Sequence, residues 1–252
     1  MPKRSRKVIL PNVFTALNIL FGFWAITYMV KEEPSFTKAA WLIVVASVFD
    51  ALDGKVARMT KSYSEFGIEF DSLADIVSFG VAPAILIYKV YFYKLGDIGK
   101  LLSFLPLLFG GIRLARFNIQ ISGFKKSDFV GMPIPTSAVS LASFVLFSLE
   151  FSNPGTLYPK FFIPLVVLLS LLMVSTIGYD TFPIFSFRRG KRNVIKLLYC
   201  LFAIILIAIF GEIVLFPFVM SYVFYGILRW FVYFFKSAEE LPEPDKSSEL
   251  NV

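Results

Sequence analysis

Four aspartates stand close together in an otherwise apolar part of the chain: Asp50, Asp53, Asp71 and Asp75. The first two are three residues apart and the last two are four apart, so each pair occupies one face of a helix. Two helices facing one another would bring the four carboxylates together. Carboxylate oxygens suit Mg²⁺, Mn²⁺ or Ca²⁺, and ionisable groups inside membrane segments mark functional sites. The pattern therefore predicts a site for one or two divalent cations.

The residues beside the first pair favour a phosphate ligand. Gly54 leaves room for a ligand to approach the backbone, and Ala57 lets two helices lie close together. Arg58, one helical turn after Gly54, can donate a forked pair of hydrogen bonds to a phosphate. Bound cations would neutralise a pyrophosphate and polarise its phosphorus. The alternative is a solvated helix end, but Asp50 and Asp71 each follow a phenylalanine among apolar residues, which argues against it.

The elements that position these residues are those of a membrane protein. The mean hydropathy of +0.72, with 57% apolar residues, is too high for a soluble chain of 252 residues. We expect an all-α, polytopic transmembrane helix bundle of about eight spans, each near the ~20 residues that cross a bilayer. The last two are separated only by Gly211 and Glu212, so a re-entrant pair is an alternative there. The expected spans cover residues 8–30, 37–56, 70–93, 99–119, 132–151, 160–179, 194–211 and 213–235.

The basic residues predict the orientation and exclude some functions. Most of the 25 lysines and arginines fall on one side if the N-terminus is cytoplasmic, which is the arrangement that the positive-inside rule favours. Both termini and the aspartates would then face the cytoplasm. The net charge of +7 alternates with apolar segments instead of forming one patch, so we expect no nucleic-acid partner. The absence of histidine excludes phosphohistidine mechanisms.

The domain organisation follows the same composition. Residues 1–236 are expected to form one integral-membrane domain. Residues 237–252 are polar and rich in proline, glutamate and serine, which is typical of a disordered tail.

The stretch from Asp50 to Asp75 resembles, without a mismatch, the signature of the CDP-alcohol phosphatidyltransferases. In these membrane enzymes an alcohol attacks the pyrophosphate of a CDP-linked lipid and CMP is released. Four further segments resemble one branch, the integral-membrane CDP-diacylglycerol–serine O-phosphatidyltransferases. They are residues 11–23, 66–84, 110–119 and 129–138. The resemblance covers most of residues 8–140.

The resemblance implies transfer of a phosphatidyl group from CDP-diacylglycerol to the hydroxyl of L-serine. It also implies two divalent ions, Mg²⁺ or Mn²⁺ or else Ca²⁺, and a homodimer among the lipids of the cytoplasmic membrane. Asp50 and Asp71 would contact both metals. Asp53 would bind the first and Asp75 the second, and Asp75 would also act as the general base for the acceptor hydroxyl.

The resemblance further implies two substrate sites. The CDP-lipid would contact Gly54, Ala57, Arg58, Ser64, Asn12 and Thr15. Asn12 and Thr15 can equally be ordinary interfacial polar residues. Arg113 and Arg116 share a helix face, and with Asn118 they would bind the carboxylate of serine or a lipid phosphate. Anchoring by the positive-inside rule is the alternative for this pair.

Three alternative functions stay open. The first keeps the chemistry but uses another alcohol, such as glycerol 3-phosphate or an inositol phosphate, although an acceptor bearing phosphate would need a denser basic pocket. The second uses an archaeal ether-lipid donor. The third is a cation transporter, which would place its carboxylates near the midplane on broken helices, whereas these aspartates are expected at the cytoplasmic end.

Overall fold

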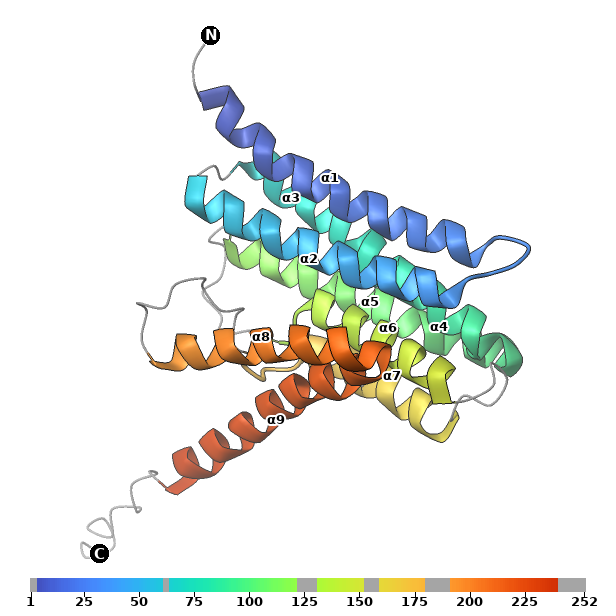
Figure 1. The fold of residues 1–252 in the computed structure, drawn as a ribbon. Helices are drawn as coiled ribbons and strands as arrows, with labels where there is room; N and C mark the ends of the chain where they lie inside the picture. Colours follow the sequence, from blue (N-terminus) through green and yellow to red (C-terminus); the bar gives the residue numbers. More distant parts are fainter. Residues whose placement is uncertain (1–3, 61–63, 122–130, 152–158, 180–190, 240–252) are drawn as a thin grey trace, which may run out of the picture.

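The computed structural model describes residues 4–60, 64–121, 131–151, 159–179 and 191–239, and every regular element within these ranges is a helix. The all-α expectation is therefore confirmed for the described residues. Helices α1 (Arg4–Met29) and α2 (Phe36–Thr60) form an antiparallel pair that packs along most of its length (Figure 1). α2 carries Asp50 and Asp53, and α1 carries the polar residues Thr15 and Asn18 that bond to aspartates.

The chain returns along this pair in one long apolar rod that carries the other two aspartates. The rod consists of α3 (Glu65–Asp75), the π-helix η1 (Ile76–Val81) and α4 (Ala82–Val90). Ser64 caps its start, because its Oγ accepts a 3.0 Å hydrogen bond from the backbone N–H of Gly67. After the 3₁₀ helix η2 (Phe92–Leu95), Gly96 adopts a φ of +61° and begins the antiparallel α5 (Gly96–Ile121).

The second half of the chain adds four helices. They are α6 (Ile134–Phe151), α7 (Pro159–Val174), α8 (Lys191–Phe210) and α9 (Leu215–Glu239), with the 3₁₀ helix η3 (Gly211–Val214) between the last two. Gly211 has a φ of +67°, which lets the chain turn back sharply. α9 continues three residues past the expected domain boundary at 236, and residues 240–252 of the expected tail lie outside the described residues.

The core lies around α6, which is buried on nearly all sides. Its hydroxyl residues can lie in the centre of the bundle because Ser140 and Ser143 donate to backbone carbonyls of the same helix. Its Phe144 packs against Phe162 of α7 and Phe216 of α9, with ring centroids 5.0 and 5.1 Å apart. α8 and the second half of α9 instead expose most of their described apolar side chains, as expected of helices that face lipid.

Each of the eight expected spans contains a helix, and among the described residues five helical segments are long and apolar enough to cross a membrane. They are Asn12–Met29, Glu65–Val90, Phe92–Ile119, Ile134–Phe151 and Gly211–Phe235. The apolar part of α7, Phe161–Val174, is shorter. The molecule therefore has the character of an integral membrane protein, while the count of eight spans stays a prediction. α1 begins, α2 ends, α3 begins and α9 ends at the same end of the bundle (Figure 1).

Candidate metal centre

Three aspartates converge between α2, which carries Asp50, and α3, which carries Asp71 and Asp75. One carboxylate oxygen from each of Asp50, Asp71 and Asp75 lies within 4.8 Å of the others. Asp75 is buried, and Asp50 and Asp71 are half-buried. The i, i+4 spacing on α3 places its two carboxylates on one face, as the sequence predicts, and that face meets Asp50 on α2.

Asp53 is not one of the three aspartates within 4.8 Å of one another, but it interacts electrostatically with Asp50 and Asp71. Its side chain is buried, and its Oδ2 accepts a hydrogen bond from the hydroxyl of Thr15 on α1. The four aspartates therefore divide into a cluster of three and a fourth carboxylate that α1 orients. Thr15, which the sequence places beside the CDP-lipid, here contacts an aspartate.

Asp75 has its own partner on α1. Nδ2 of Asn18 donates a 3.3 Å hydrogen bond to Oδ1 of Asp75, and the backbone carbonyl of Asn18 accepts a 2.9 Å bond from the hydroxyl of Ser78. The sequence analysis missed Asn18. The available signal was the recurrence of polar or small residues every three or four positions along residues 12–22, which defines one face of α1.

The backbone beside Asp75 departs from a regular α-helix. The π-helix η1 begins at the next residue, and π-helical turns occur frequently at functional sites. α1 reaches this turn through Gly22, where an added Cβ would lie 2.2 Å from Oγ and 2.7 Å from Cα of Ser78. Only a residue without a side chain allows the two backbones to come this close.

The cluster fits a divalent cation. It offers three carboxylates at ligand spacing, and Oδ1 of Asp71 is buried without a hydrogen-bond partner in the described part of the chain. Arg113 on α5 interacts electrostatically with Asp75 and Asp50. None of the ion pairs within 4.0 Å among the described residues involves the cluster. One arginine beside three carboxylates leaves negative charge that a hard cation would neutralise.

The residues expected at the CDP-lipid lie around the same end of the bundle. Gly54 is exposed and Ala57 half-buried on α2, and Ser64 caps α3. Oδ1 of Asn12 lies 3.6 Å from the place where a Cβ on Gly67 would be, which places Asn12 beside the start of α3. The side chain of Arg58 lies outside the described residues.

The three residues expected at the acceptor have different surroundings. Arg113 is half-buried beside the aspartates, whereas Arg116 is exposed. Nδ2 of Asn118 donates a 3.0 Å hydrogen bond to Oγ of Ser72, which ties α5 to α3. Arg113 is thus placed beside the cluster, whereas the acceptor roles of Arg116 and Asn118 stay predictions.

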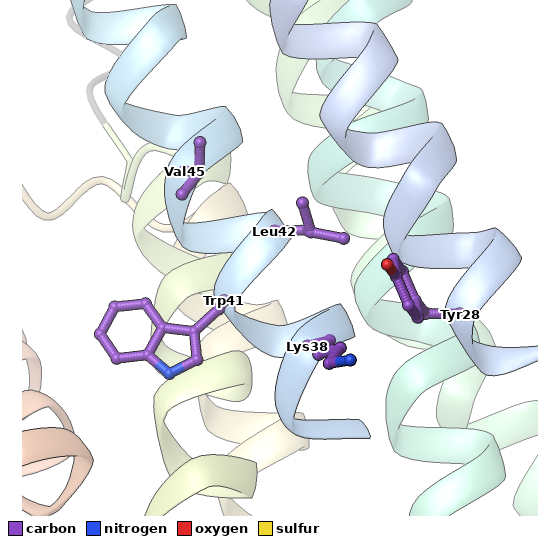
Figure 2. A pocket seen from close by; sticks show the side chains of 5 residues that line it. All are labelled: Tyr28, Lys38, Trp41, Leu42 and Val45. Carbon is purple, nitrogen blue, oxygen red and sulfur yellow. The ribbon is translucent and has the colours of Figure 1, made fainter. Parts of the chain in front are cut away.

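A surface hollow of about 270 Å³ lies between α1 and α2, away from the aspartates (Figure 2). It is lined by Tyr28, Lys38, Trp41, Leu42 and Val45. None of the four aspartates lines it, and the lining residue nearest to Asp50 along α2, Val45, precedes it by five residues, which at 1.5 Å per residue is roughly 8 Å. The hollow is therefore not part of the metal centre.

Comparison with known proteins places this geometry in a family context. Residues 8–177 match the family profile of the CDP-alcohol phosphatidyltransferases. A CDP-diacylglycerol–serine O-phosphatidyltransferase of Helicobacter pylori is 40% identical over 222 residues, covering 88% of this chain and 91% of the relative. A protein of the same name from Methanocaldococcus jannaschii is 38% identical over 180 residues, covering 71% and 77%. An archaetidylserine synthase of Methanothermobacter thermautotrophicus is 37% identical over 174 residues, covering 68% and 70%.

Proposed function

Since the chain belongs to the CDP-alcohol phosphatidyltransferase family, we propose that it transfers a phosphatidyl group from CDP-diacylglycerol to the hydroxyl of L-serine. The products are phosphatidylserine and CMP. The observation that carries this proposal is the convergence of Asp50, Asp71 and Asp75 within 4.8 Å in a chain whose relatives bear the name of this activity.

Asp50, Asp71 and Asp75 would hold the divalent cations, with Asp53 as a further ligand that Thr15 orients. Partners of this kind fix a ligand in its binding orientation. Mg²⁺ or Mn²⁺ held there would neutralise the pyrophosphate and polarise the phosphorus that is attacked. Three carboxylates without such a cation would repel the donor instead.

Asp75 has the second role of general base. Asn18 holds one oxygen of its carboxylate, and the other can accept the proton of the serine hydroxyl. The hydroxyl oxygen then bonds to the phosphorus that carries the diacylglycerol, and the bond from that phosphorus to the bridging oxygen breaks. CMP leaves with the electron pair. Holding the hydroxyl in line for this attack supplies much of the rate enhancement.

The donor site lies at the same end of the bundle. We assign Gly54, Ala57, Arg58 and Ser64 to the CDP group, with Asn12 and Thr15 beside them. Their positions support this assignment. Ser64 and Asn12 both lie beside Gly67 at the start of α3, the helix that carries Asp71. The acyl chains would extend into the surrounding lipid.

We further propose that the active site lies at the cytoplasmic face of the inner membrane, where serine can enter it from water and CMP can leave into water. We also propose a homodimer, on the basis of the family resemblance. Gly80 and Gly110 pack within the chain, against Leu107 and Ile134, so they give the dimer no separate support. Native mass spectrometry from lipid nanodiscs that shows only monomer would contradict it.

The experiment that tests the function uses the purified protein in nanodiscs containing CDP-diacylglycerol. L-serine, glycerol 3-phosphate and an inositol phosphate are offered separately, and CMP and the lipid product are measured. Of the three acceptors, we expect only L-serine to cause CMP release. A second set of nanodiscs carries a CDP-linked ether lipid, because one relative bears the name archaetidylserine synthase. CMP release with a phosphate-bearing alcohol but not with serine would refute the assignment.

A further inference from the structure

A second group of polar side chains lies next to the aspartates and comes from the C-terminal half of the chain. Arg113 interacts electrostatically with Tyr222 of α9 as well as with Asp75 and Asp50. Tyr222 in turn lies beside Tyr179, which follows α7, with ring centroids 5.9 Å apart. Tyr222 therefore links the surroundings of the aspartates, through Arg113, to Tyr179.

Two hydrogen-bond donors in this group lack acceptors. The hydroxyl of Tyr179 and Nε of Arg113 are both buried and have no hydrogen-bond partner in the described ranges. Tyr179 is only 8% exposed. A buried polar group without a partner is unfavourable, and such groups in native proteins call for an explanation. Because a guanidinium donates only and a tyrosine hydroxyl readily donates, an acceptor would satisfy both groups, and the charge of Arg113 favours an anionic one.

The fold holds Tyr179 in this place. On α9, an added Cβ at Gly226 would lie 2.3 Å from Cε1 of Tyr179, so the glycine makes room for the ring. Nη2 of Arg229 donates a 3.1 Å hydrogen bond to the carbonyl of Gly178, the preceding residue. α9 thus fixes both the ring and the backbone of this segment, which is what a binding site requires of its supporting residues.

We propose that Arg113 and Tyr179, with Tyr222 beside them, bind the carboxylate of the amino-acid acceptor. This inference rests on the proposed function and names the site of its second substrate. A carboxylate bound between the two residues would accept from both donors, and a neighbouring arginine favours its charge. An amino acid held there presents its hydroxyl toward Asp75. Tyr179 and Tyr222 both lie beyond residue 177, where the match to the family profile ends, so the choice of acceptor would depend on α9.

The test compares L-serine with serinol, in which a hydroxymethyl group replaces the carboxylate. Tyr179→Phe removes the hydroxyl and keeps the ring. We expect its KM for L-serine to rise about 10-fold or more, the usual effect of losing a hydrogen bond to a charged group. The KM for serinol, measured as substrate or as competitor, should change less than about twofold. Donor affinity, measured by calorimetry, should stay the same.

Tyr225→Phe serves as the matched control, because Tyr225 is an exposed tyrosine on the same helix; it should leave both KM values unchanged. The same KM values are measured for Tyr222→Phe, which replaces Tyr179→Phe if that variant fails to fold. An unchanged KM for L-serine, or an equal rise for both acceptors, would overturn the proposal. A loss of donor affinity with an unchanged serine-to-serinol ratio would assign the cluster to a lipid phosphate instead. Wild-type protein that releases no CMP with serine would refute the proposed function before any variant is compared.

Discussion

Asn18 of α1 donates a hydrogen bond of 3.3 Å from its Nδ2 to Oδ1 of Asp75 on α3. Both side chains are buried, and α1 itself carries no aspartate. The helix thus orients a carboxylate that belongs to another element, and it does the same for Asp53 through Thr15. α1 therefore acts as the supporting element of the aspartate site.

Asp75→Asn should separate chemistry from donor binding. Asparagine keeps an oxygen that can coordinate a cation, but it cannot take a proton at neutral pH. We expect turnover to fall by about 10²–10⁴-fold, the usual contribution of a general base, while CDP-diacylglycerol still binds. Calorimetry of donor binding beside the serine-dependent rate measures both quantities. Asp50→Asn and Asp71→Asn are the comparisons and should weaken donor binding as well. Near-normal turnover in Asp75→Asn would disprove the general-base role.

Removal of divalent cations should abolish CMP release. Without a cation, three carboxylates within 4.8 Å would repel the pyrophosphate. We expect activity to vanish after dialysis against EDTA and to return with Mg²⁺ or Mn²⁺, and we expect calorimetry to show the same dependence for donor binding. Full activity in the metal-free protein would contradict the metal centre.

Thr15→Val should weaken the response to metal. The substitution keeps the shape of the side chain but removes the hydrogen bond to Asp53. Loss of a partner that orients a ligand typically costs about 10–100-fold in metal affinity, so the Mg²⁺ concentration for half-maximal activity should rise by that factor. Thr15→Ser should restore it. Thr27→Val is the control, because that hydroxyl on the same helix bonds to the carbonyl of Trp24. An unchanged Mg²⁺ requirement would show that Asp53 is not a ligand.

Gly22→Ala should destabilise the protein and lower its activity. The new methyl group would meet Ser78 at 2.2 Å and push α1 away from η1, which also moves Asn18 from Asp75. Overpacking of this kind costs about 1–3 kcal/mol. Gly111→Ala is the control, since its nearest neighbour, Cδ1 of Ile76, lies at an ordinary 3.6 Å. Thermal unfolding in detergent measures the difference, and equal midpoints for both variants would contradict the close approach.

The orientation can be tested with introduced cysteines after replacement of Cys200 by alanine. Glu65 is exposed at the start of α3, near the metal centre, and Glu32 is exposed at the opposite end of the bundle. In intact cells, an impermeant thiol reagent should label Glu32→Cys and leave Glu65→Cys unlabelled until the cells are opened. Labelling of Glu65→Cys from outside would place the aspartates on the other face of the membrane.

The sequence by itself determined the class of fold and the position of the aspartate cluster in the chain. Helices follow from apolar segments long enough to cross a bilayer, because the backbone must satisfy its own hydrogen bonds in lipid. The spacing between Asp71 and Asp75 decides their common face, because the helical repeat is a local property.

The tertiary structure decided which side chains meet across helices. Spacing did not reveal that Asp53 would pair with Thr15, that Asn18 would donate to Asp75, or that Tyr179 would lie beside Tyr222. These contacts depend on how closely two helices approach, and that distance is set by packing between residues far apart in the chain. Gly22 lets α1 pack closely against η1, and Gly226 lets α9 accommodate the ring of Tyr179. The sequence does not indicate which residue either glycine will contact.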